Sequence, residues 1–271
     1  RVNSDEQTRM NYLQQLISGI DKIWEETVLS DNFDPFDIQQ LHVIELTIMC
    51  HSSILYSLSS TYSNILRDFM PQLMVAMQIL SQAMPNAETE EILNAIKSAK
   101  FQIFNILFKF CYFCYQQDLI VKMVIPATFK PILDDYLNSE PQFRLRSSLK
   151  YFTAIFTRCV CVIDEMVFNT YDLIMDATLP MISDDYSEYM EIRTEFFNLT
   201  ASIVHHYSKV LANKDPEYID TIMKTLKFGA EHANQQICEN CIELISDLFM
   251  SFKTEMLPAE RFADFFDHYY I

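Results

Sequence analysis

Glycine is almost absent from this chain, since Gly19 and Gly229 are the only two among 271 residues. Doubly wound α/β folds, barrels and β-sandwiches need tight turns and close backbone approaches, and many of those positions take glycine. A Gly-rich phosphate-binding loop is excluded for the same reason. Helices need few glycines, and half of the residues are apolar, so the sequence predicts an all-α protein with a substantial core.

Apolar residues recur at helical spacing along nearly the whole chain. The segment 188–211 carries two such stripes. The first holds Ile192, Phe196, Leu199, Ile203 and Tyr207, and the second holds Phe197, Val204 and Leu211. A helix with two apolar stripes is covered on two sides, as happens when helical hairpins stack side by side.

Prolines divide this pattern into segments at Pro35, Pro85, Pro141 and Pro216, because the residue before a proline is pushed out of the α region. The expected helices cover residues 6–28, 36–58, 61–84, 88–116, 119–138, 143–164, 168–183, 188–211, 215–230, 233–252 and 258–270. The connections are short, so neighbouring helices should run antiparallel.

A repeat links the second helices of successive pairs. An aromatic residue followed by apolar positions begins at Phe129, recurs 42 residues later at Tyr171 and again 47 residues later at Tyr218. Periods of about 40–47 residues with two helices each are typical of HEAT repeats. We therefore expect a right-handed α-solenoid, with residues 1–271 as one continuous HEAT-repeat array of about five helix pairs plus an N-terminal helix. Because the sequence starts at Arg1 rather than Met, we also expect it to be part of a longer protein.

The net charge of −17 bears on the choice of partners. Nucleic acids and anionic membranes are bound through Lys and Arg, so this balance favours basic protein partners instead. The very apolar stretch 101–115 is shorter than the roughly 20 residues of a membrane span and contains Lys109, so we expect a buried helix. Seven cysteines without a secretion signal predict reduced core thiols in the cytosol or nucleus.

Three carboxylates, Asp184, Asp185 and Glu188, fall within one short stretch between two expected helices. They are consistent with a solvated acidic turn, with a contact patch for a basic partner, or with a Mg²⁺ site of an all-helical enzyme. A metal cage needs a second carboxylate cluster on a facing helix, and the sequence offers none with convincing spacing. The acidic pair Asp134 and Asp135 raises the same question.

No other pattern predicts catalysis. The spacing of Cys111 to Cys114, and of Cys238 to Cys241 with His232 nearby, is compatible with zinc, but both pairs lie in apolar helical patterns that favour core thiols. Adjacent histidines point about 100° apart on a helix and form no local dyad. We therefore expect no enzyme, no metal and no cofactor.

Two stretches resemble the C-terminal part of the exportin-1 family of nuclear export receptors, in the importin-β superfamily. One is Pro131 to Arg144, in which a proline-led helix ends in Asp-Tyr and a Pro-x-x-Arg turn follows. The other lies within 173–211 and carries Asp176, Ala177, Thr178, Leu179, Met181, Ile182, Asp185, Tyr186, Glu188, Tyr189, Glu191, Arg193, Phe196, Phe197 and Leu199.

The resemblance implies HEAT-type hairpins and a role in carrying leucine-rich export-signal cargo out of the nucleus with Ran-GTP, past Phe-Gly nucleoporins. It implies shuttling between nucleus and cytoplasm. The cysteine of the family's export-signal groove has no match here, so we expect this chain to supply scaffold and Ran or nucleoporin contact surface rather than that groove. Crevices between the first helices of successive pairs are the expected site for Phe side chains, and Asp184, Asp185 and Glu188 the expected site for Ran. The alternative is another HEAT or armadillo interaction scaffold.

Overall fold

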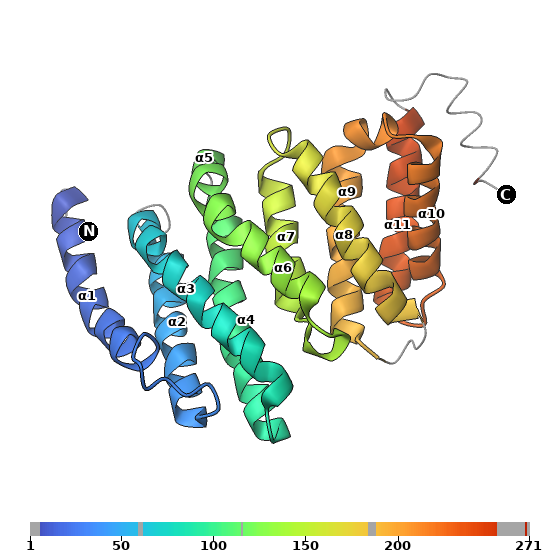
Figure 1. Cartoon of the computed structure of the whole chain (residues 1–271). Coiled ribbons are helices and arrows are strands. Elements are labelled where there is room, and N and C mark those ends of the chain that lie inside the picture. The colour runs from blue at the N-terminus through green and yellow to red at the C-terminus, as the bar shows by residue number, and fades with distance from the viewer. Residues whose placement is uncertain (1–5, 59–61, 115, 184–187, 254–268, 270–271) are drawn as a thin grey trace. The chain divides into compact units, whose positions relative to one another are not determined.

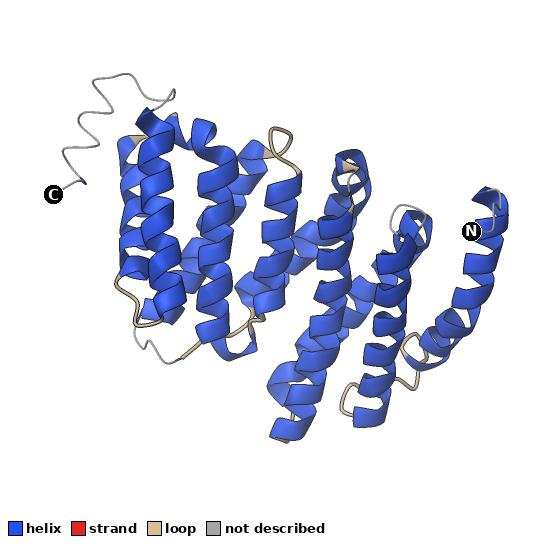
Figure 2. Ribbon diagram, turned by 180° about the vertical axis from the view of Figure 1, so that it is seen from behind, coloured by secondary structure: helices blue, strands red, loops and turns tan. Residues whose placement is uncertain are grey.

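The computed structural model describes residues 6–58, 62–114, 116–183, 188–253 and 269, and every regular element in these ranges is helical (Figures 1 and 2). The prediction of an all-α fold is confirmed. The chain divides into two compact units, residues 1–151 and 152–271. The continuity of one array over 1–271, and its handedness, stay predictions.

The α-helices are α1 (Glu6–Thr27), α2 (Ile38–Leu58), α3 (Ser63–Ala83), α4 (Glu90–Phe113), α5 (Gln117–Leu119), α6 (Lys130–Asn138), α7 (Arg146–Arg158), α8 (Asp164–Ser183), α9 (Met190–Ala212), α10 (Pro216–Ala230) and α11 (Gln235–Ser251). Two 3₁₀ turns, η2 (Met84–Asn86) and η4 (Pro141–Phe143), and a π-helix, η3 (Ile120–Phe129), connect them. The four prolines used as boundary markers all lie between helices or at a helix start. The expected helix 258–270 lies almost wholly outside the described residues.

The first unit is built from stacked hairpins. Helix α2 packs against α1 on one side and α4 on the other, while α3 packs against α4, η3 and α6. Seen from opposite sides, α2 and α4 form one layer, and α3 with the η3–α6 segment forms a second layer (Figures 1 and 2). This pairwise packing is that of an α-solenoid.

In the second unit, α9 packs against α8, α10 and α11. All eight residues of the two predicted stripes of α9 are buried, which confirms that this helix is covered on two sides. On α11, Ile237, Cys241 and Leu244 are buried on one face. Ile242 is 54% exposed, because it lies about 100° around the helix from Cys241.

The segment 119–138 is not one uniform α-helix, because ten of its residues form the π-helix η3. Pro126 lies inside η3, and Pro131 lies in the first turn of α6. Proline has no N–H to donate and its ring displaces the carbonyl of the preceding turn, which fits a widened helix here.

The predicted helix 143–164 is also too long, since α7 ends at Arg158 and α8 begins at Asp164. Cys161 adopts a left-handed φ of 65°, and its N–H donates to Asp164 Oδ1 at 3.0 Å. This hydrogen bond to the carboxylate stabilises the turn between the two helices. The prediction that the cysteines are core thiols is correct for Cys111, Cys114, Cys159 and Cys241, whereas Cys50 and Cys161 are exposed.

Candidate protein-binding surfaces

The predicted acidic site is described only at one of its residues. Glu188 is exposed and precedes Tyr189, which adopts a left-handed φ of 52° directly before α9. Asp184 and Asp185 lie outside the described residues. The proximity of the three carboxylates therefore stays a prediction.

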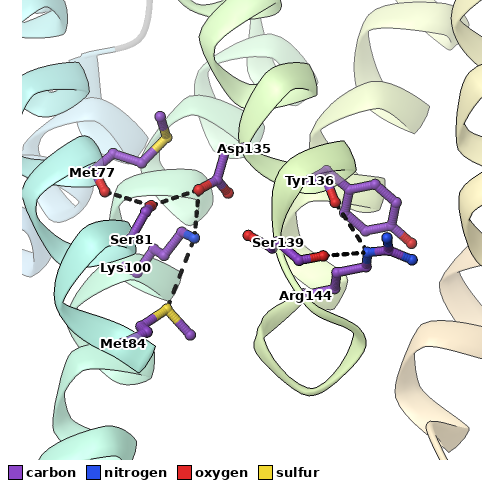
Figure 3. Close-up of polar contacts among 8 residues, drawn as sticks. All are labelled: Met77, Ser81, Met84, Lys100, Asp135, Tyr136, Ser139 and Arg144. Carbon is purple, nitrogen blue, oxygen red and sulfur yellow. Dashed lines mark hydrogen bonds and ion pairs between the residues drawn. The ribbon is translucent and has the colours of Figure 1, made fainter. Parts of the chain in front are cut away.

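The acidic pair Asp134 and Asp135 separates in the structure, and Figure 3 shows the partners of Asp135. Asp135 Oδ1 accepts hydrogen bonds from Lys100 Nζ at 2.8 Å and from Ser81 Oγ at 2.5 Å. The Lys100 side chain is 1% exposed and that of Asp135 is 8% exposed, so this ion pair is buried where α3, α4 and α6 meet. Asp134 is half exposed and pairs with Lys130 on its own helix. The two carboxylates point to different partners and do not form a shared metal site.

Burial lowers the pKa of Lys100, and the charge of Asp135 and its hydrogen bond oppose that shift. A buried pair of this kind contributes little net stability, but removing one member leaves the other uncompensated. It therefore fixes the mutual placement of α4 and α6. No local sequence pattern singles out Lys100, because its partner is 35 residues away.

A cleft of about 620 Å³ opens beside this ion pair, between α3 and α6. Its apolar lining includes Met74, Val75 and Met77 from α3 and Pro131 and Phe143 from the α6 side. Both Asp134 and Asp135 line it, but each is already paired with a lysine.

A second crevice, of about 570 Å³, lies between α2 and α4, the first helices of two successive hairpins. It is lined by Met49, Ser52, Ser53, Tyr56, Gln102, Asn105 and Lys109. Met49 is 49% exposed and Tyr56 is 72% exposed, so apolar surface is accessible on the α2 wall. A crevice between first helices is therefore present at this position, and its use as a site for Phe side chains stays a prediction.

Tyr56, which lines this crevice, also contacts an aromatic cluster at the end of α4. The ring centroid of Phe113 lies 5.4 Å from that of Tyr56 and 5.2 Å from that of Tyr112, both in edge-to-face geometry. Phe108 lies 5.7 Å from Tyr112, which is 52% exposed. Edge-to-face aromatic clusters accept further rings well, since the positive ring edge meets the negative ring face.

The zinc hypothesis for Cys238, Cys241 and His232 does not match the geometry. Both ring nitrogens of His232 lie near other groups, Nε2 at 3.0 Å from Arg193 Nη1 and Nδ1 at 2.9 Å from the Asn234 N–H. Burial and the Arg193 charge lower the pKa of His232. Within the described ranges, no three His, Cys, Asp or Glu side chains are placed to hold a metal ion. None of the described helices combines the length and apolarity needed to cross a membrane.

Known proteins provide an independent comparison. A family model described as "CRM1 C terminal" matches residues 41–271. Protein EXPORTIN 1B of Arabidopsis thaliana is 22% identical over 264 residues, which cover 93% of this chain and 24% of the plant protein. Exportin-1 of Schizosaccharomyces pombe is 29% identical over 154 residues, which cover 57% of this chain and 14% of the yeast protein.

The chain thus spans about a quarter of the length of the plant relative it matches. The family model covers most of the chain, including residues 41–151 of the first unit, all of the second unit and the stretches that carry the resemblance in sequence. This chain belongs to the CRM1 C-terminal family of exportin-1 proteins.

Proposed function

We propose that this chain is the nucleoporin- and Ran-contacting part of a nuclear export receptor that carries leucine-rich export-signal cargo with Ran-GTP. The receptor shuttles between nucleus and cytoplasm, and the cargo groove lies outside this chain. The family match and the names of the exportin relatives support a role in nuclear export. The net charge of −17 supports basic protein partners over nucleic acid.

The α2–α4 crevice is the observation that carries the nucleoporin proposal. A Phe side chain needs a concave apolar pocket with a few polar groups at its rim. Met49 and Tyr56 supply apolar surface, while Gln102, Asn105 and Lys109 supply side-chain donors for the peptide backbone beside the Phe. Because a single Phe side chain buries little apolar surface, one Phe binds weakly, and a segment with several Phe-Gly units gains affinity by engaging several sites.

A titration with a Phe-Gly nucleoporin segment, followed by calorimetry, tests this function. We expect saturable binding that disappears when every Phe of the segment is replaced by Ser. In the chain, Met49→Glu should weaken binding because it places a charge on the crevice wall. Val75→Glu is the matched control, since both side chains are 49% exposed and Val75 lies at the other cleft of the same unit.

Equal weakening by Met49→Glu and Val75→Glu would remove the α2–α4 crevice as the site. The absence of any saturable binding would leave this chain as a structural part of the receptor. The Ran proposal is tested separately by neutralising Asp184, Asp185 and Glu188 together, which should lower affinity for Ran-GTP. Unchanged assembly with Ran-GTP would refute a role for these three carboxylates.

A further inference from the structure

An acidic pocket between α1 and α3 has no part in the function proposed above. Its volume is about 190 Å³, and its lining contains Asp21 and Glu25 from α1 and Asp68 from α3. Two amides, Gln14 and Gln72, and two apolar side chains, Ile65 and Phe69, complete the wall. The pocket therefore combines negative charge with neutral acceptors and an apolar surface.

The charge of this pocket is uncompensated. No Lys, Arg or His is among its lining residues. In the part of the chain that the structure describes, Glu25 and Asp68 make no ion pair, whereas the neighbouring Glu26 pairs with Lys22 at 3.5 Å. Burial and the negative charge of Glu25 both raise the pKa of Asp21. A cationic group in the pocket would relieve this repulsion.

A buried histidine lies next to Asp21. The side chain of His51 is fully buried, and its Nε2 lies 3.3 Å from Asp21 Oδ1 without a hydrogen-bond partner. The other ring nitrogen, Nδ1, lies 2.6 Å from the Tyr62 hydroxyl. When Tyr62 donates to Nδ1, the neutral ring carries its proton on Nε2, the nitrogen that lies near Asp21. Since the ring also stacks on Phe69 with centroids 4.4 Å apart, this orphaned N–H is held toward one wall of the pocket.

We propose that the α1–α3 pocket receives an arginine side chain presented by a protein partner. The guanidinium has five N–H donors in a planar fork, which suits several carboxylates and amide oxygens spaced around one pocket. Ile65 and Phe69 pack against its aliphatic stem. Arginine is one of the residues enriched at the hot spots of protein interfaces. The proposal holds whether or not the α2–α4 crevice binds Phe.

The structure favours an organic cation over a metal ion. A metal requires inner-sphere ligands that converge on one point, and no three candidate ligand side chains among the described residues do so. A guanidinium instead hydrogen-bonds to acceptors that are distributed over several ångströms.

The test is an NMR titration of the chain with Nα-acetyl-arginine amide, with the neutral isostere Nα-acetyl-citrulline amide as the control probe. We expect saturable shifts of α1 and α3 amides with a Kd on the order of 1 mM for a ligand of this size, and none with citrulline. The variant Asp21→Asn/Glu25→Gln/Asp68→Asn should weaken binding by about tenfold or more. The control Glu231→Gln/Glu239→Gln/Glu243→Gln removes the same charge from exposed sites of the second unit and should bind within about twofold of the wild type.

The pocket variant removes like charges that repel one another, so its far-UV circular dichroism should match that of the wild type. If the triple variant does not fold, the single Asp68→Asn variant replaces it, with an intermediate weakening of arginine binding expected. A linear, non-saturating response overturns the proposal, as does equal weakening in both triple variants, which would indicate diffuse electrostatics. If MgCl₂ gives saturable shifts that the pocket variant loses, while the arginine probe gives none, the proposal is overturned in favour of a hydrated metal ion.

Discussion

The two glycines should respond in opposite ways to the same substitution. At Gly229 on α10, an added Cβ would lie 2.3 Å from Cys241 Sγ and 2.6 Å from Phe197 Cε1. Cys241 is fully buried and Phe197 is 2% exposed, so neither side chain can move into solvent. Since carbon atoms pack best at about 3.5–4.0 Å, relief requires a shift of more than about 1 Å.

Overpacking a tight core costs about 1–3 kcal/mol, and this clash belongs at the upper end of that range. Alanine stabilises a helix interior by about 1 kcal/mol relative to glycine, which offsets part of this cost. Gly229→Ala should therefore lower the free energy of unfolding by about 2 kcal/mol. At Gly19 on α1 an added Cβ meets nothing within 4 Å, so Gly19→Ala should raise it by about 0.5–1 kcal/mol.

Differential scanning calorimetry of both variants provides the test. At about 2–4 °C per kcal/mol, Gly229→Ala should lower Tm by about 4–8 °C, and Gly19→Ala should raise it by about 1–4 °C. In a Gly229→Ala/Cys241→Ala double variant the closest clash is absent, so the loss should be smaller than the sum of the single losses. A rise in Tm for Gly229→Ala like that for Gly19→Ala would refute the close approach of α10, α11 and α9.

Further predictions concern buried charge. Lys100→Met should cost about 3 kcal/mol of unfolding free energy in urea denaturation because it leaves Asp135 uncompensated, and adding Asp135→Asn should recover most of that loss. Burial lowers the pKa of His51 from 6.5 to about 4, so the unfolded chain binds the extra proton between these values and stability falls as pH drops from 6.5 to 4. In the wild type the loss of unfolding free energy should reach roughly 3 kcal/mol, and Asp21, whose pKa is raised, should oppose part of it. The loss should be absent in His51→Gln. An equally steep loss in that variant would assign it to other groups.

Helix type and boundaries were largely predictable because they depend on local chemistry. The period of apolar residues identified the two buried faces of α9, and the prolines marked four boundaries. Prediction failed where the apolar period continues through a change in the backbone that the period does not encode. The turn at Cys161, which Asp164 holds, and the π-helix around Pro126 are two such places.

The sequence predicted what kind of surface to expect but not which residues form it. Crevices between first helices follow from the expected architecture, but the aromatic rings around Tyr56 and Phe113 come together only when α2 packs on α4. The acidic pocket joins Asp21 to Asp68 across two helices, and neither carboxylate stands out in its own segment.

The sequence by itself determined that this chain is helical, acidic and a member of an exportin family, because two glycines, a 3.6-residue period and a few conspicuous strings are properties of the linear chain. Only the tertiary structure decided that Gly229 lies against Cys241, that Lys100 pairs with Asp135, and that His51 points at Asp21. Each of these contacts joins different helices. Their register is set by how the side chains of whole helix surfaces interlock, and no local pattern encodes that packing.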